Sequence, residues 1–275
     1  MSRSLAPQLH IESPSDLAPI RQRLQSIDTE RWADITRLVG LSDAGEPIRV
    51  VLQAEDSNVA RNAPRWIAGF AVEALGTVVI FPSRSPIYPD NTLEDVLRHE
   101  VAHVLIGRAA AGQPVPRWFD EGLAMEAERE RRFRDQTQLL YQLVTGPRTN
   151  LDDLNRLFRG GESDQVRAYA IAGALVHEVR QRFGAGISGR ILARIRDGAS
   201  FDEAFRSETG LEPIAFENEF WKSQRIWTTW LSIFTSAGIL WPAIALLALV
   251  AIYVRHRRNL EIEKRWEEEG DDDGE

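Results

Sequence analysis

Residues 92–107 read TLEDVLRHEVAHVLIG, and the spacing of their apolar residues predicts an amphipathic helix. Thr92 is a suitable N-cap for this helix, and Asp95, at its third position, can reach back to the cap. The helix carries the pentapeptide HEVAH at 99–103, in which two histidines stand four residues apart. Residues with this spacing share one helical face, so both imidazoles can reach one metal ion at about 2.0 to 2.1 Å.

Two glutamates extend this pattern. Glu100 lies about 100° round the helix from His99, beside the ion rather than in line with the rings, which suits a general base. Two histidines leave zinc short of the three protein ligands that a catalytic site usually has. Residues 116–128 read PRWFDEGLAMEAE, where Pro116 suits the first turn of a second helix and Glu121 can project inward. Glu121 is therefore the expected third ligand.

Other acidic and histidine residues are open to more than one interpretation. A carboxylate is expected to orient each histidine ligand, and Asp95, Asp120 and Glu126 are all candidates between which the sequence does not choose. His177 has no second histidine at ligand spacing, so we expect a surface or capping role for it.

Composition narrows the class of protein. The chain has 275 residues, 43% of them hydrophobic, which permits one sizeable folded domain with appendages. It has no cysteine, so a metal must be held by His, Asp or Glu. A formal net charge of −8, with neither half of the chain strongly basic, argues against nucleic acid as a partner.

The order of the expected elements predicts the fold class. Apolar residues at helical spacing run through 17–39, with a possible break near Asp28. Three short β-rich runs follow, at 48–52, 67–72 and 77–81. From Thr92 onward the pattern is helical almost throughout. Strands followed by helices predict an α+β domain, a small mixed sheet followed by helices, with the chemistry on the helical side.

Residues 231–254 read LSIFTSAGILWPAIALLALVAIYV and contain no charged side chain. This run is long enough to cross about 30 Å of hydrocarbon, so it predicts one C-terminal transmembrane helix anchored in a lipid bilayer. Trp227, Trp230 and Tyr253 flank it, as interfacial aromatic residues do. The expected organisation is a domain at 1–225, a membrane helix with its interfacial tryptophans at 226–254, and a basic and then acidic disordered tail at 255–275.

The topology of this anchor has two interpretations. Basic residues cluster at 255–258, after the span, which places the tail in the cytoplasm and the globular domain outside the cell membrane. Residues 1–20 lack the apolar core of a signal peptide. Either an export signal precedes Met1, which we favour, or the protein is tail-anchored with a cytoplasmic domain.

HEVAH followed by RWFDEGLA resembles the gluzincin metallopeptidases, and particularly the peptidase MA-like membrane proteins, whose pattern is HExxH and then WxxEGxA. The resemblance extends over about 48–221 and implies a zincin-like metallopeptidase domain with Zn²⁺ on His99, His103 and Glu121. The segment between His103 and Glu121 is a residue or two shorter than in the best-known gluzincins.

The resemblance also implies two features around the metal. In the family an edge strand beside the metal pairs with an extended substrate, and the similar segment here is GTVVIF at 76–81. Family members carry a tyrosine that hydrogen-bonds the oxyanion, in a segment similar to AYAIAGALVHEVRQRFG at 168–184. Tyr169 matches that position.

The expected function is therefore that of a membrane-anchored zinc metallopeptidase acting on a peptide or protein substrate, with Glu100 as general base. Two alternatives remain open. One is a membrane-tethered binding or scaffold protein that keeps a zincin fold without turnover. The other is a zinc hydrolase of a non-peptide amide, which the same ligand set allows.

Overall fold

The computed structural model describes residues 4–84, 92–129, 148–234 and 255. The chain divides into two compact units, Met1–Trp221 and Lys222–Glu275, with the division inside helix α11 (Pro213–Phe234). The fold described below is that of the first unit.

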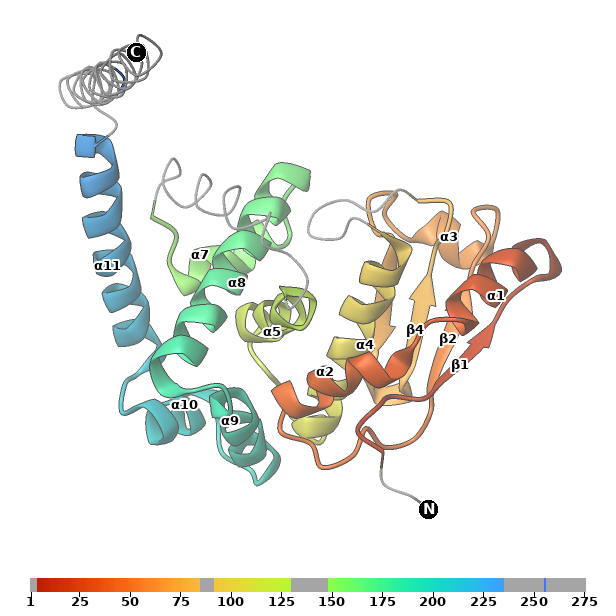
Figure 1. Cartoon of the computed structure of the whole chain (residues 1–275), viewed down its shortest axis with the longest axis horizontal. Coiled ribbons are helices and arrows are strands. Elements are labelled where there is room, and N and C mark those ends of the chain that lie inside the picture. The colour runs from red at the N-terminus through yellow and green to blue at the C-terminus, as the bar shows by residue number, and fades with distance from the viewer. Residues whose placement is uncertain (1–3, 85–91, 130–147, 235–254, 256–275) are drawn as a thin grey trace, which may run out of the picture. The chain divides into compact units, whose positions relative to one another are not determined.

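A four-stranded mixed sheet forms one side of this unit (Figure 1). Its strands are β1 (Leu9–Glu12), β2 (Ile48–Leu52), β3 (Gly69–Val72) and β4 (Thr77–Ile80), in the spatial order β1-β2-β4-β3. β1, β2 and β4 run parallel, and β3 returns antiparallel to β4. All four residues of β4, TVVI, are buried, as β-branched residues of a central strand should be.

Helix α4 (Leu93–Ala109) lies against the sheet and carries the HEVAH sequence. The Thr92 side chain caps it by accepting a hydrogen bond from the Asp95 backbone N–H at 3.2 Å, as the sequence predicts. Almost every side chain of α4 is buried, because β3 and β4 cover one face and α5 covers another. The expected amphipathic helix is therefore a central one, buried nearly all round.

The chain reverses between α4 and α5 (Arg117–Arg129). Gly112 adopts a left-handed φ of 72°, and its N–H donates to the Gly107 carbonyl at 2.9 Å, which closes the end of α4. Pro116 directly precedes α5, and its carbonyl accepts from the N–H groups of Phe119 and Asp120 at 2.9 and 3.1 Å. The Gly and Pro residues thus bring α5 back beside α4.

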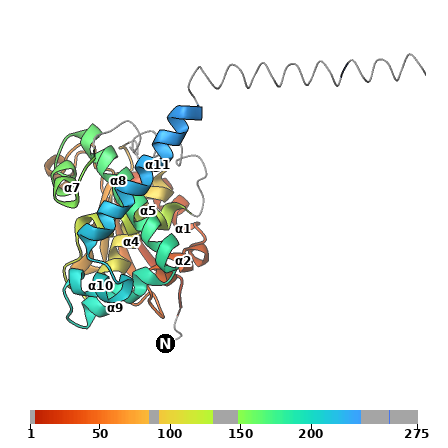
Figure 2. The ribbon, with the colours of Figure 1, turned by 90° about the vertical axis from the view of Figure 1, so that its left-hand side faces the viewer.

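Helix α8 (Glu162–Phe183) packs on α5 from the side away from the sheet. Figure 2 views the molecule from this helical side, with α8 and α5 in front of α4. The α5–α8 contact requires Gly122, because a β-carbon there would lie 2.5 Å from the Ala172 carbonyl oxygen and 2.4 Å from Val176 Cγ2. The glycine of the EG pair therefore permits a close helix crossing.

The remaining described elements lie around this arrangement or follow it in the chain. Before and around the sheet they are η1 (Ser15–Leu17), α1 (Ala18–Gln25), η2 (Thr29–Trp32), α2 (Ala33–Leu38), α3 (Asn58–Asn62) and η3 (Glu73–Leu75). After α5 they are α7 (Leu151–Leu157), α9 (Ile187–Arg196), α10 (Phe201–Thr209) and α11 (Pro213–Phe234).

Within the described residues, the expected helical and strand segments are present, with two differences. The break near Asp28 exists, since Asp28 is the N-cap of η2. β1 was not expected, and it pairs in parallel with β2.

The second difference concerns the segment 76–81, expected to pair with substrate at a sheet edge. β4 lies inside the sheet, with β2 on one side and β3 on the other, so that expectation is wrong. Both backbone edges of β4 are already used by its neighbours. Within the described residues, β3 is the strand at this edge of the sheet.

Among the residues that the structure describes, no helix is both long enough and apolar enough to cross a bilayer. The predicted span at 231–254 lies outside the described residues, apart from 231–234 at the end of α11. The tail at 255–275 also lies outside them, apart from Arg255.

Candidate metal centre

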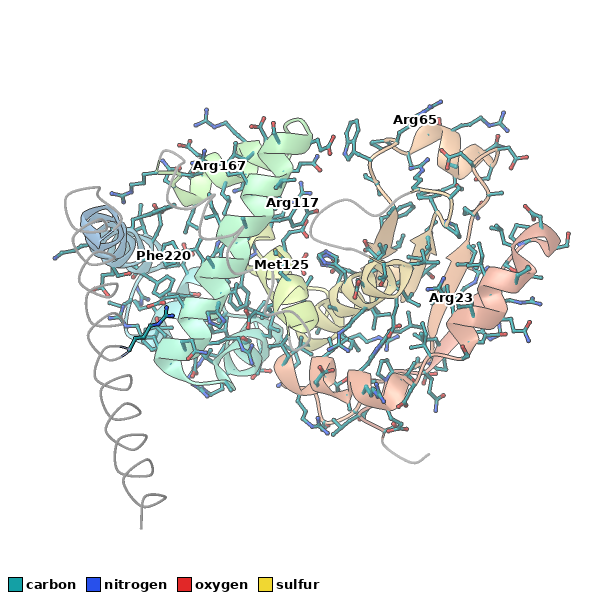
Figure 3. All side chains as sticks on the ribbon, turned by 45° about the horizontal axis from the view of Figure 1, so that its top comes forward. Arg23, Arg65, Arg117, Met125, Arg167 and Phe220 are labelled. Carbon is teal, nitrogen blue, oxygen red and sulfur yellow. The ribbon has the colours of Figure 1, made fainter. Side chains whose placement is uncertain are left out.

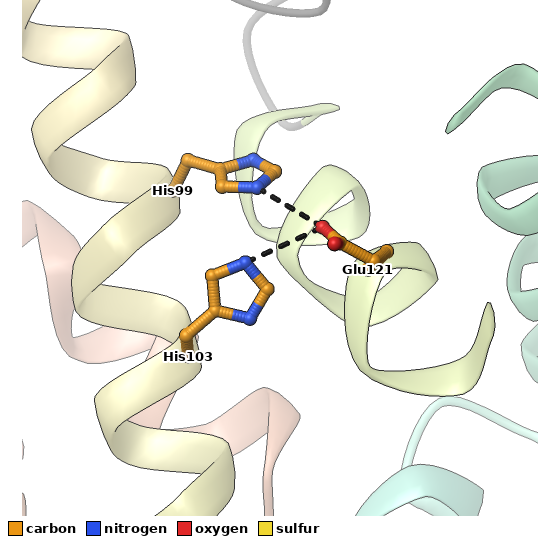
Figure 4. A group of neighbouring side chains, drawn as sticks. All are labelled: His99, His103 and Glu121. Atoms are coloured by element: carbon orange, nitrogen blue, oxygen red, sulfur yellow. Dashed lines mark ion pairs between the residues drawn. The ribbon is translucent and has the colours of Figure 1, made fainter. Parts of the chain in front are cut away.

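Two adjacent helices bring the three predicted ligands together (Figure 4). His99 and His103 project from one face of α4, and Glu121 faces them from α5. Oε2 of Glu121 lies 3.5 Å from Nε2 of His99 and 3.4 Å from Nε2 of His103. One donor atom from each residue lies within 4.8 Å of the others, and all three residues are buried.

The donor set fits a zinc ion. The buried Oε2 atom of Glu121 has no hydrogen-bond partner among the described residues, and its separations from the two imidazoles exceed the usual 2.7 to 3.2 Å. A buried carboxylate oxygen left in this state is costly unless a cation meets it. Two imidazole nitrogens and one carboxylate oxygen form the His₂Glu set that zinc accepts in catalytic sites.

Asp120 lies next to Glu121 in sequence and faces His103. Its Oδ2 atom is 3.0 Å from Nδ1 of His103, the ring nitrogen that points away from Glu121. The two groups are close enough for an ion pair, although Nδ1 makes no well-aligned hydrogen bond, and Nε2 is left facing Glu121.

The structure thus chooses among the three candidate orienting carboxylates. Asp95 accepts a hydrogen bond from the Thr92 hydroxyl at 2.6 Å, at the start of α4. Glu126 contacts His177 and Arg180 on α8.

The pKa values of His103 and Glu121 are shifted from their ordinary values by their surroundings. Burial acts to lower the pKa of His103, but Asp120 and Glu121 outweigh it and raise that pKa well above the usual value. Burial acts in the opposite sense on Glu121, yet its contacts with His103 and His99 hold the pKa of its carboxyl well below the usual range. The site therefore holds a carboxylate that stays ionised although it is buried.

Glu100 lines the same cavity as the three ligands and is also buried. Burial raises the pKa of Glu100, and the opposing effect of His103 and His99 does not cancel it. A carboxylate in such a position gains basicity, which is what a general base requires.

Tyr169, on α8, also reaches the cavity. Its ring lies edge-on to that of His99, with centroids 6.1 Å apart, and 5.5 Å from the ring of Phe158. The structure therefore brings Tyr169 to the metal-ligand cluster from the side opposite the sheet.

The cavity has a volume of about 490 Å³ and lies between the sheet edge and the helices. One wall is formed by β3 and the loop before it, including Trp66, and the other by α5, α8 and the end of α7. Sequence reasoning missed Arg117, Phe158 and Arg159, which also line it. Arg117 was detectable, because it precedes Glu121 by four residues and so shares its helical face.

No protein-family model matches the chain, and a search of the curated proteins finds no relative. The interpretation of this centre therefore depends on its residues and their geometry.

Proposed function

We propose that this chain is a membrane-anchored zinc metallopeptidase that hydrolyses peptide bonds. The observation that carries the proposal is the buried Oε2 atom of Glu121, which faces both histidine Nε2 atoms without a hydrogen-bond partner in the described structure. Glu100 on the same cavity adds the group that hydrolysis needs beyond metal binding.

Bound zinc would supply a Lewis acid that polarises the scissile carbonyl and lowers the pKa of a water molecule toward about 7. Glu100 takes a proton from the attacking water and returns it to the leaving amine. Tyr169 donates a hydrogen bond to the developing oxyanion, a role typically worth about 3 to 4 kcal/mol. Asp120 would hold the ring of His103 with Nε2 toward Glu121, where the two residues would share a bound ion.

An extended peptide is the substrate that the cavity suits best. The backbone segment from Ala68 to Ala71, which includes most of β3, lines the cavity, and within the described residues β3 is paired on one side only. A peptide lying along this edge would form backbone hydrogen bonds in the manner of an added strand. This edge favours a peptide over a small non-peptide amide, which the ligand set alone would equally accept.

The membrane part of the proposal depends on the sequence. Residues 231–254 would cross the bilayer, with the catalytic domain outside the cytoplasm and the tail at 255–275 inside. A tail-anchored form would reverse the position of the domain. Protease digestion of intact cells distinguishes the two topologies, since the protease degrades the catalytic domain only if that domain lies outside the cell.

The test is Glu100→Gln in the full chain, solubilised in detergent and assayed against a peptide library. We expect hydrolysis to fall by about 10² to 10⁴-fold because the general base is lost, while zinc content and thermal stability are retained. Glu94→Gln is the matched control. It makes the same chemical change on α4, at a residue that does not line this cavity.

Retention of full activity by Glu100→Gln would refute the mechanism. A parent protein that binds zinc but cleaves only non-peptide amides, or nothing, would favour the hydrolase or scaffold alternative.

A further inference from the structure

Arg117 touches the proposed third ligand directly. It occupies the first position of α5, four residues before Glu121, and its Nε–H donates to Oε1 of Glu121 at 3.2 Å. The Glu121 side chain is 9% exposed and that of Arg117 is 44% exposed, so the guanidinium reaches the carboxylate from the open side of the cavity. In Figure 3, Arg117 lies on the edge of the helical part that faces the sheet.

A second contact holds the guanidinium in place. Its Cζ atom lies 4.7 Å from the centroid of the Phe158 ring, within the roughly 6 Å of a cation–π contact. Phe158 is buried at the end of α7, and its ring packs against Tyr169. Arg117 is thus fixed both by a hydrogen bond to Glu121 and by a rigid aromatic surface.

The two oxygens of Glu121 are therefore not equivalent. Oε1 accepts the hydrogen bond from Arg117, and Oε2 faces the two histidine Nε2 atoms. Rotation about the last side-chain bond of a glutamate has only a shallow barrier, so without Arg117 either oxygen, or both, could turn toward the histidines.

We propose that Arg117 is a positioning residue that commits Glu121 to bind zinc through Oε2 alone. This inference rests on the proposed zinc function. Arg117 acts through Glu121, as hydrogen-bond partners of metal ligands do, and does not itself contact the ion.

The cavity offers a matched control. Arg159 also lines it and carries the same charge, but it is exposed and makes no hydrogen bond or ion pair with Glu121 in the described structure. Removing Arg159 changes the charge of the cavity without changing how Glu121 is held. Comparing the two arginines therefore separates hydrogen bonding from charge alone.

The experiment measures zinc affinity of the full chain in detergent by competition with a chromophoric chelator. Arg117→Met should weaken zinc binding by about 10 to 100-fold, the usual effect of losing such a partner. Arg159→Met should leave it unchanged. Arg117→Lys should remain impaired, because lysine keeps the charge but lacks the planar guanidinium that stacks on Phe158.

Substitution of cobalt for zinc provides a spectroscopic readout. If Glu121 binds through both oxygens in Arg117→Met, coordination rises from four to five and the visible absorption of Co²⁺ weakens. The spectrum of Arg159→Met should match that of the parent. Phe158→Leu removes the aromatic surface but leaves Arg117. It should therefore weaken zinc binding by less than Arg117→Met does. If Arg117→Met does not fold, Phe158→Leu is the variant that tests the inference.

Equal losses of zinc affinity in the two methionine variants would overturn the inference in favour of a charge effect. Parent-like affinity and spectrum in Arg117→Met would overturn it outright. Failure of the parent chain itself to bind zinc would instead overturn the proposed function, so the two failures are distinguishable.

Discussion

Helix α5 carries two buried carboxylates, Glu121 and Glu126, and each faces histidine from another helix. At Glu126, Nδ1 of His177 lies 3.1 Å from Oε1, and Arg180 donates to Oε2. At Glu121, Oε2 faces the two imidazoles of α4 and no arginine. Residues of the same types, five positions apart on one helix, thus form two different environments.

The difference between them is the source of positive charge. Arg180 compensates Glu126 from within the protein, so that cluster is complete as an ion pair. The oxygen of Glu121 that faces the histidines has no such partner among the described residues, and this leaves a position for an external cation. A buried carboxylate near histidine therefore indicates a metal where one of its oxygens lacks a cation from the chain, as Oε2 of Glu121 does in the described structure although Arg117 donates to Oε1.

The largest expected effect separates the histidines of the two clusters. His99→Ala removes one of three proposed ligands, so we expect zinc to be lost on dialysis and hydrolysis to fall to background. His177→Ala leaves the three ligands intact and should retain both. Metal analysis after dialysis and a peptide cleavage assay check this, and zinc loss in the His177 variant would contradict the comparison.

A smaller effect concerns the two carboxylates in zinc-free protein. Glu126→Gln removes the charge that faces Arg180 and should lower the free energy of unfolding by about 1 to 3 kcal/mol. Glu121→Gln should cost less, because the amide oxygen can still accept from Arg117 and Oε2 makes no hydrogen bond that would be lost. Only the attraction of His99 and His103 for the charged carboxylate is removed. Urea unfolding with a chelator present measures both, and the reverse order would show that the distinction is wrong.

The smallest effect comes from a third buried carboxylate, Glu217, whose arginine is farther away. Arg148 lies 3.7 Å from Oε1 of Glu217, and burial raises the pKa of this carboxyl although Leu151 and Arg148 oppose it. The folded state then holds the proton more tightly than the unfolded state does. This stabilisation is complete below the ordinary pKa of 4.5 and is lost as pH rises through the raised value.

Glu217→Gln should remove this pH dependence, at about 1.4 kcal/mol for each pKa unit of difference between the two states. Chemical unfolding of the parent and the variant measures this between about pH 4 and pH 7. The lower limit lies roughly half a unit below the ordinary pKa, and the upper limit is neutrality. Identical pH profiles would show that Arg148 fully compensates Glu217.

Local pattern accounts for much of the fold. Thr92 caps α4 because its side chain and the Asp95 N–H are neighbours in sequence, and the strand at Ile48–Leu52 follows from a short β-rich run. β1 was not predictable in this way, since Ile11 is the one β-branched residue in LHIE and the segment becomes a strand by pairing with β2, far along the chain.

At the candidate metal centre, too, some features follow from local sequence and others from tertiary packing. The sequence alone determined that His99 and His103 share a helical face and that Glu100 lies about 100° round the helix from His99, because these are properties of helix geometry. Glu121 was expected for a different reason, the number of protein ligands that a zinc site needs. The tertiary structure decided that Asp120 orients His103, that Arg117 holds Glu121 against Phe158, and that β3 is the edge strand in place of β4. Strand order and contacts between helices depend on how distant segments pack together, and the spacing of residues along the chain carries no record of that packing.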